Sequence, residues 1–289
     1  MPTVARDRAA LSQSLSSARR PLHLVPTMGA LHAGHAAVLR AARKEAATVV
    51  MSLFVNPLQF DDPTDLGRYP RAFDADLAVA GECGVDVVWA PDEDEMYPGG
   101  SPATTIHVAG VSERWEGEHR PGHFDGVATV VAKLFHQVGA DAAWFGRKDA
   151  QQLAVVRRMV ADLDFPLGVR EHPTVRDADG LALSSRNALL EPGQRQDALA
   201  LSAGLFRAAR WAERGELDAG VLETACGDDL EYAALVDADT FEPMAELEGR
   251  AVLAAAKRVG NVRLIDNVFI DAPPGGNIRA DLGVRVETQ

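Results

Sequence analysis

The chain of 289 residues is long enough for two packed domains, and its content of 47% hydrophobic and 25% charged residues is typical of soluble globular proteins. It has no apolar run near the roughly 18 residues that a membrane-spanning helix needs. Its net charge of −13 disfavours a nucleic-acid partner, because phosphate binding requires a basic face, and two cysteines without a CxxC or zinc pattern fit a cytoplasmic protein.

Predicted strands alternate with predicted helices over the first half of the chain. Residues 1–20, rich in Ala, Arg and Ser, are interpreted as an amphipathic first helix rather than a transit peptide. Apolar, β-branched runs predict strands at 22–25, 48–55, 85–90, 103–108 and 142–145. Helical spacing predicts helices at 36–47, 73–83, 126–138 and 149–163. The alternation predicts an α/β fold with a Rossmann-like, doubly wound parallel sheet, which binds ligands at the carboxyl ends of its strands.

The pattern changes near residue 174. A long helix is predicted at 193–214, followed by short strand candidates at 231–236, 251–255 and 262–270. This order is typical of a smaller α+β domain. We therefore predict a Rossmann-like domain at 1–174 and a smaller C-terminal domain at 175–289.

The strongest motif runs from Pro26 to His35, between the first predicted strand and the helix after it. His32 and His35 are three residues apart and share one face of the helix start, and Gly34 lets a ligand approach the backbone. First-turn N–H groups have no helical partners and suit a phosphate, to which the imidazoles can also donate. Because His35 stands where a P-loop requires Lys, and no GxGxxG occurs, the motif is neither a P-loop nor a nicotinamide fingerprint.

Three further segments carry groups for binding. Asn56 and Gln59 follow a predicted buried strand, where amides can bind a substrate with hydroxyl and carboxylate groups. Lys148 and Gln152 are four apart at a helix start and can face one cleft. The run of Ser184, Ser185 and Arg186 offers two hydroxyl donors and a guanidinium fork for phosphate. Asn56 is equally well explained as an amide that satisfies its own loop before Pro57. For Gln59 the alternative is a surface residue, and binding is favoured over it.

The His-x-Gly-His element resembles the nucleotidylyltransferase and class I aminoacyl-tRNA synthetase superfamily. In combination with five other segments in this order, it resembles the pantothenate synthetase (pantoate–β-alanine ligase) family. The segments are Phe54–Phe60, Met96–Pro98, Arg120–Phe124, Gly146–Gln152 and Thr174–Asn187. Asp266, Asn267 and Val268 match more weakly.

The resemblance implies ATP-dependent condensation of (R)-pantoate with β-alanine, giving pantothenate, AMP and pyrophosphate through a pantoyl adenylate. ATP would be a substrate that carries Mg²⁺ with it, and the family is expected to form homodimers through the first domain. The small domain would close over the site and keep water from the adenylate.

The resemblance also implies a role for each matching residue. The groups expected to act in catalysis are His32, His35 and Lys148. The wall beside the nucleotide is expected to consist of Pro26, Thr27, Met28 and Gly29. Independently of the resemblance, Gly34 gives a ligand access to the backbone, and Gly146 is expected to permit a tight strand-to-helix turn. The β- and γ-phosphates are assigned to Lys148, Ser184, Ser185 and Arg186, adenine to the backbone of Val175, and pantoate to Gln59 and Gln152, with Asn56 nearby.

Two residues depart from the family pattern. Arg147 stands where Glu is usual, so it either adds a cation beside the phosphates or points to the surface. Leu183 stands where Met is frequent and should only reshape contact with the nucleotide. Asp149, in the same segment as Arg147, could cap a helix or bind a ribose hydroxyl.

Two other functions remain open from the sequence alone. Another His-x-Gly-His nucleotidylyltransferase would transfer AMP or CMP to a phosphate ester and would need a basic acceptor pocket. A non-catalytic nucleotide-binding regulator would bind ATP without exchanging pyrophosphate, and only Arg147 and Leu183 favour it. We predict no metal site, because His119 and His123 have ligand-like spacing but no third ligand nearby.

Overall fold

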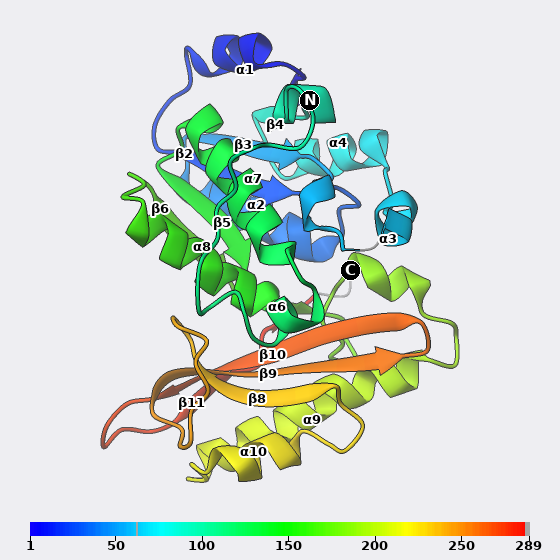
Figure 1. Cartoon of the computed structure of the whole chain (residues 1–289), viewed down its shortest axis with the longest axis vertical. Helices are drawn as coiled ribbons and strands as arrows, with labels where there is room; N and C mark the ends of the chain where they lie inside the picture. Colours follow the sequence, from blue (N-terminus) through cyan, green and yellow to red (C-terminus); the bar gives the residue numbers. More distant parts are fainter. Residues whose placement is uncertain (62, 287–289) are drawn as a thin grey trace. The chain divides into compact units, whose positions relative to one another are not determined.

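The computed structural model describes residues 1–61 and 63–286, which fall into two units (Figure 1). Unit 1 comprises Met1–Phe145 and Val155–His172, and unit 2 comprises Gly146–Ala154 and Pro173–Gln289. The motif that begins at Gly146 therefore packs with the C-terminal part of the chain, although a predicted strand of the first domain leads directly into it. Among the described residues, none of the helices combines the length and apolar character that crossing a membrane requires.

Unit 1 is built on a sheet with the strand order β1-β4-β3-β2-β5-β6. The pairs β1–β4, β4–β3, β3–β2 and β2–β5 are parallel. The predicted Rossmann-like sheet is confirmed. The strands are β1 (Thr3–Ala5), β2 (Leu22–Thr27), β3 (Thr48–Leu53), β4 (Val87–Trp89), β5 (Ala142–Gly146) and β6 (Gly168–His172).

Helices cover both faces of this sheet, because its side chains alternate between them. Val25 and Met51 pack with the apolar residues of α2 and α4 on one face. On the other face, Trp89 Nε1 donates to Gln137 Oε1 of α7 at 2.9 Å. The helices and turns before β5 are α1 (Arg8–Leu15), α2 (Ala33–Glu45), η1 (Pro57–Gln59), α3 (Pro63–Arg68), α4 (Phe73–Glu82), α5 (Glu93–Met96), α6 (Glu116–His119) and α7 (His123–Val138).

The predicted strand at 103–108 is wrong, since these residues, all described, form neither strand nor helix. The Ile106 N–H donates to Thr129 Oγ1 on α7 at 2.9 Å, and His107 Nδ1 lies 2.9 Å from Asp125 of the same helix. Thr104 and Thr105 are exposed, and these hydrogen bonds of Ile106 and His107 go to α7 rather than to a neighbouring strand. The strands β1 and β6 were not predicted, because β1 lies within the segment assigned to the first helix and β6 (GVREH) has no continuous apolar run.

Unit 2 contains an antiparallel sheet with the order β11-β10-β9-β8. The hairpin of β9 and β10 turns at Gly260, whose φ of +58° lies in the left-handed region that favours glycine. A small parallel pair joins β7 to β12. The elements of this unit are η2 (Arg147–Asp149), β7 (Val175–Arg176), η3 (Ser185–Leu189), α9 (Arg195–Glu213), α10 (Ala219–Ala225), β8 (Tyr232–Asp237), β9 (Gly249–Val259), β10 (Val262–Ala272), β11 (Arg279–Asp281) and β12 (Val284–Arg285). Helix α8 (Ala150–Asp162) begins in unit 2 and continues in unit 1.

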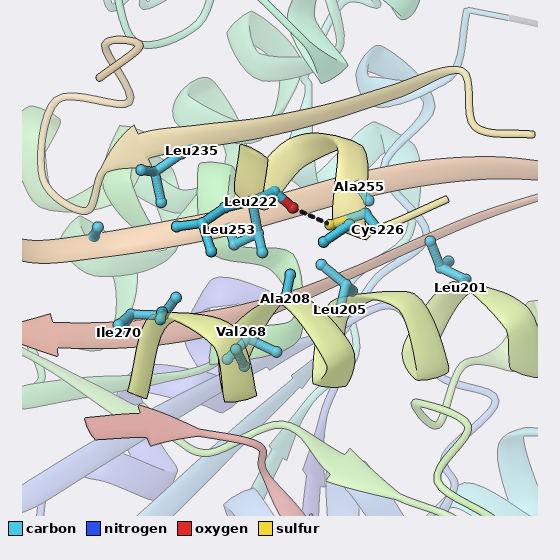
Figure 2. Close-up of a cluster of buried hydrophobic side chains, with 14 of the residues drawn as sticks. Leu201, Leu205, Ala208, Leu222, Cys226, Leu235, Leu253, Ala255, Val268 and Ile270 are labelled. Carbon is cyan, nitrogen blue, oxygen red and sulfur yellow. Dashed lines mark hydrogen bonds between the residues drawn. The ribbon is translucent and has the colours of Figure 1, made fainter. Parts of the chain in front are cut away.

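The core of unit 2 lies between the sheet and the helices α9 and α10 (Figure 2). A Cβ on Gly204 of α9 would lie 1.8 Å from Cys226 O, so α9 passes directly against the end of α10. This close approach gives the sheet a continuous apolar cover. The buried side chains include Leu201, Leu205, Ala208, Leu222, Cys226, Leu253, Val268 and Ile270.

Candidate active site

Two histidines close the first turn of α2 as a capping box. His32 is the N-cap residue, and its Nδ1 accepts a hydrogen bond from the Gly34 N–H at 3.1 Å. His35 Nδ1 accepts from the His32 N–H at 3.3 Å, and the two ring centroids are 4.1 Å apart. A ring nitrogen that accepts a hydrogen bond carries no proton, so each neutral imidazole holds its proton on Nε2. Both side chains are thus Nε2–H donors.

This arrangement corrects one expectation from the sequence. The open N–H groups of the first turn were expected to bind phosphate, but the N–H groups of His32 and Gly34 are given to imidazole nitrogens. Because a single N–H makes one good hydrogen bond, these two amides are engaged already. The donors that this helix start can offer an anion are therefore chiefly imidazole Nε2–H groups.

The loop before α2 is held by Asp76, a residue of α4 that is only 3% exposed. Its Oδ2 accepts from the Ala30 N–H at 3.0 Å, and its Oδ1 from the Leu31 N–H at 2.8 Å. The loop needs this support because Gly29 (φ +84°) and Ala30 (φ +51°) both lie in the left-handed region, which costs an alanine roughly 1–2 kcal/mol. A Cβ on Gly29 would lie 2.8 Å from Asp76 Oδ2, so the position requires glycine for space as well.

The predicted nucleotide wall follows directly from the end of β2. Pro26 and Thr27 are the last residues of that strand, and Met28 and Gly29 come next. Thr27 Oγ1 donates to Ser52 O on β3 at 2.7 Å. The wall is therefore fixed to the carboxyl edge of the sheet, the edge at which such sheets bind ligands.

Asn56 is fully engaged within the protein. It is 1% exposed, and its Nδ2 donates to Gly126 O at 3.0 Å and to Gln59 Oε1 at 3.2 Å. Its Oδ1 accepts from Tyr97 Oη at 2.8 Å. Burial, and then the nearby Glu93, raises the pKa of Tyr97 well above its usual range, so this hydroxyl remains a donor. These contacts are those of a residue that positions Gln59.

The backbone and side chain of Gln59 are held from two further directions. Gln59 Nε2 lies 2.8 Å from Met28 Sδ. Gln59 O accepts from Arg120 Nη2 at 3.2 Å and lies 2.8 Å from His123 Nδ1. His123 Nε2 lies 3.1 Å from Arg120 Nη1, and since a guanidinium only donates, the His123 proton must lie on Nδ1 and point at Gln59 O. The segment Arg120–Phe124 therefore supports Gln59.

In unit 2, Lys148 lies on a turn that is fixed to β10. Asn267, which is 3% exposed, donates from Nδ2 to Arg147 O at 3.0 Å and to Lys148 O at 2.8 Å. Lys148 Nζ lies 3.3 Å from Asp149 Oδ1. The position of the ammonium group thus depends on a side chain more than a hundred residues away in the sequence.

Arg176 anchors the strand that carries Asn267. Its side chain is buried, its guanidinium carbon lies 4.8 Å from the ring centroid of Phe206, and it forms a bidentate ion pair with Asp266 at 2.7 and 2.9 Å. Asp266 Oδ1 also accepts from the Asn267 N–H at 2.7 Å. All five guanidinium N–H groups have acceptors, the other three being the carbonyls of Gly180, Asn267 and Leu282.

Arg147 does not fit either sequence-based interpretation. It pairs with the Asp281 carboxylate of β11, and its guanidinium lies 4.9 Å from the ring centroid of Phe269. Its side chain is 21% exposed, so it does not point freely into solvent. Asp281 offsets part of the charge of Arg147, as Asp149 does for Lys148. The pairing of β11 with β10 places Asp281 beside Arg147, and the sequence does not reveal this pairing.

Three of the four predicted phosphate ligands of unit 2 line one pocket. Lys148, Ser184 and Arg186 line it with Arg263, whereas Ser185 does not, all of them being described residues. The pocket has a volume of about 20 Å³, room for one water molecule, so a phosphate must bind at its rim or widen it. Ser184 Oγ accepts from the Arg186 N–H at 3.2 Å, which sets the turn of η3.

The remaining predicted residues of unit 2 surround these groups. Val175 O accepts from the Leu183 N–H at 2.9 Å, which joins the proposed adenine contact to the residue that departs from the family pattern. Gly146 has φ −82°, so its turn does not need glycine, and a Cβ there would meet no described atom within 4 Å. The space beside the Gly146 Cα is therefore open. Gln152 lies in the first turn of α8, half-buried.

Neither unit offers a protein metal site among the described residues, which contain no group of three or more His, Cys, Asp or Glu side chains suited to hold an ion. Sequence reasoning missed Asp76 altogether and did not assign tasks to Tyr97, Arg176 or Asn267. All four act on residues far away in the chain. An acidic residue in the first turn of α4 was the only local signal of Asp76, and it is also what an ordinary helix start contains.

Comparisons with known proteins agree with this arrangement. The family model described as pantoate-β-alanine ligase matches residues 2–269. A pantothenate synthetase from Koribacter versatilis is 48% identical over 281 residues, which cover 94% of this chain and 96% of the relative.

Solved structures are similar over the same extent. The pantothenate synthetase of Thermus thermophilus superimposes with a TM-score of 0.84 at 43% identity, covering 92% of this chain and 98% of the other. The pantoate-β-alanine ligase of Francisella tularensis, complexed with β,γ ATP and β-alanine, gives a TM-score of 0.75 at 31% identity, with coverage of 92% and 97%.

Proposed function

The chain belongs to the pantoate–β-alanine ligase family, and from this membership we propose that it works through a pantoyl adenylate. The enzyme joins pantoate to β-alanine at the expense of ATP. In the first step the pantoate carboxylate attacks the α-phosphorus of ATP and expels pyrophosphate. In the second, the β-alanine amine attacks the activated carbonyl and releases AMP, leaving pantothenate. Family membership disfavours both a phosphate-ester acceptor and a purely regulatory role.

Unit 1 supplies the donors for the adenylation step. The capping box carries this proposal, because it makes the Nε2–H groups of His32 and His35 donors for the oxygens of the α-phosphate as negative charge builds on them. His35 is the candidate to give a proton to the leaving pyrophosphate. Gln59, held by Asn56 and by the Arg120–Phe124 segment, is positioned to bind a hydroxyl or carboxylate oxygen of pantoate.

Unit 2 supplies positive charge for the leaving group. Lys148 and Arg186, with the Ser184 and Ser185 hydroxyls, are proposed to bind the β- and γ-phosphates. Val175 and Leu183 are proposed to contact the nucleotide and Asp149 its ribose, while Gln152 binds pantoate. No covalent enzyme intermediate is required, because orientation and charge stabilisation supply the catalysis.

Other features follow from the resemblance rather than from the geometry. We propose that Mg²⁺ enters as part of the ATP substrate. We also propose that the enzyme is a cytoplasmic homodimer. Analytical ultracentrifugation of the full chain tests the dimer directly.

The function is tested by pyrophosphate–ATP exchange with and without pantoate, in the absence of β-alanine. Exchange should depend on pantoate. His35→Asn is the sharpest variant, since the Asn Oδ1 can take the place of Nδ1 in the capping box while the Nε2–H donor is lost. It should lower the exchange rate about 10²- to 10³-fold with folding intact.

His136→Ala serves as the matched control, because His136 is exposed on α7 and has no assigned role. Exchange without pantoate, or none from folded, ATP-binding protein, would refute the adenylate mechanism. A loss below about threefold for His35→Asn would remove His35 from the chemistry.

A further inference from the structure

Three consecutive backbone N–H groups before and at the start of α2 are bound by side chains. The N–H groups of Ala30 and Leu31 donate to the two carboxylate oxygens of Asp76, and the next N–H, that of His32, donates to His35 Nδ1. Only the φ and ψ of Leu31 separate the peptide plane that Asp76 holds from the plane that carries the His32 N–H, so holding the first restricts the second. Asp76 thereby sets the direction of the N–H that fixes the His35 ring.

The loop requires such an anchor because its backbone adopts a strained conformation. Gly29 and Ala30 have φ values of +84° and +51°, and an alanine adopts the left-handed region only where surrounding contacts enforce it. Asp76 makes the contacts to the strained residue itself and to the one that follows. Without them the loop would relax at the position that leads directly into the histidine pair.

A carboxylate is an unexpected choice beside a site for polyphosphate, because its charge repels the substrate. Two features of the structure account for it. Asp76 lies in the first turn of α4, where the helix dipole favours negative charge. Only a carboxylate presents two acceptor oxygens to two neighbouring N–H groups at once, whereas an amide presents one acceptor and one donor.

We propose that Asp76 is a positioning residue for the reaction, which holds the His35 imidazole with Nδ1 as acceptor and Nε2–H as donor. The proposal rests on the function assigned to His35 above. It makes Asp76 act on the rate of adenylation through the loop, without touching a substrate.

Asp76→Asn tests this with almost no change in size. The Asn NH₂ group must face one of the two N–H donors, so one hydrogen bond is lost and two donors are opposed. Asp74→Asn is the matched control, since Asp74 lies on the same helix turn but is exposed. Pantoate-dependent exchange by Asp76→Asn should fall about 10- to 100-fold in kcat, with the KM for ATP changed less than about threefold, because misplaced catalytic groups cost rate. Asp74→Asn should match the wild type.

A second measurement reads the histidine directly. In ¹⁵N-labelled protein, the ring nitrogens of His35 should report the Nε2–H form in the wild type and in Asp74→Asn, and a mixture of forms in Asp76→Asn. Wild-type exchange by Asp76→Asn would overturn the proposal, as would a loss that disappears once activity is expressed per folded molecule. If the wild type shows no exchange, the assigned function fails, and the nitrogen shifts alone decide whether Asp76 positions His35.

Discussion

Gly126 of α7 is the position at which one added methyl group should disturb the binding of pantoate. The helix passes so close to η1 that a Cβ on Gly126 would lie 2.3 Å from Leu58 O, 2.5 Å from Leu58 C and 2.7 Å from Gln59 N. Gly126 O is also an acceptor for Asn56. The Gly126→Ala variant therefore presses on the turn that carries Gln59.

The sign of the effect is decided by two opposing magnitudes. Alanine in place of glycine within a helix stabilises it by about 1 kcal/mol. Overpacking in a close contact costs about 1–3 kcal/mol, and the upper part of that range applies because the opposing atoms are backbone and cannot change rotamer. To restore a carbon–oxygen separation of about 3.3 Å, η1 must move by about 1 Å. We expect a net destabilisation of about 1–2 kcal/mol and a displaced Gln59.

Urea unfolding and steady-state kinetics measure the two consequences separately. A displacement of about 1 Å in a binding group can cost about 100-fold, so the KM for pantoate should rise far more than the KM for ATP. Gly81→Ala is the control, since Gly81 lies on α4 and an added Cβ would meet only Pro2 Cδ, at an ordinary 3.5 Å. It should be neutral or slightly stabilising. If Gly126→Ala behaved in the same way, with an unchanged KM for pantoate, the inferred contact between α7 and η1 would be refuted.

Three further predictions rest on other parts of the structure. Asn267→Asp places a carboxylate against two backbone carbonyls. It should destabilise the protein by about 2–4 kcal/mol and lower the rate of pyrophosphate–ATP exchange at least about tenfold. Asn277→Asp, at an exposed position, is the control and should change stability by less than about 0.5 kcal/mol. A backbone hydrogen bond from the start of β2 lowers the pKa of Asp141 below its ordinary 3.8, so its stabilisation is present above that value and is lost as the pH falls through the folded pKa. Asp141→Asn should therefore cost about 1 kcal/mol or less at pH 7, and the cost should shrink in urea titrations as the pH falls below 3.8; a cost that did not shrink with falling pH would contradict the assignment. Burial raises the pKa of Cys226 to about 12 and also raises that of Cys83, so a thiol reagent at pH 8 should label neither in the folded protein and both in urea.

Elements with a clear apolar run or amphipathic spacing could be predicted from the sequence, and β1 and β6, which lack both, could not. The continuous apolar run of β3 and the amphipathic spacing of α7 gave their positions to within a few residues. The segment at 103–108 shows the limit of this reasoning, because Thr104 and Thr105 are exposed and the Ile106 N–H donates to a helix rather than to a neighbouring strand. A β-branched composition favours a strand, but whether the segment pairs in a sheet depends on the rest of the fold.

The same distinction applies to the site. The residues expected to meet substrate stand in local motifs, so His32, His35 and Lys148 could be chosen from spacing and from resemblance. The residues that hold them could not, since Asp76 binds a loop 46 residues earlier in the chain. The direction of each imidazole proton depends on these distant contacts and on cap geometry, which no pattern of residue types specifies.

The start of α2 illustrates how the chain exchanges one kind of donor for another. Amide N–H groups at a helix start and side-chain N–H donors can both stabilise negative charge that develops on a phosphate. Here the amides of His32 and Gly34 are bound by the Nδ1 atoms, and the donor function passes to side-chain Nε2–H groups. A histidine can also release its proton to a leaving group, which a backbone amide cannot do. The capping box therefore orients two imidazole N–H donors at the helix start, and such local donors matter more for the proposed adenylation than the net charge of −13.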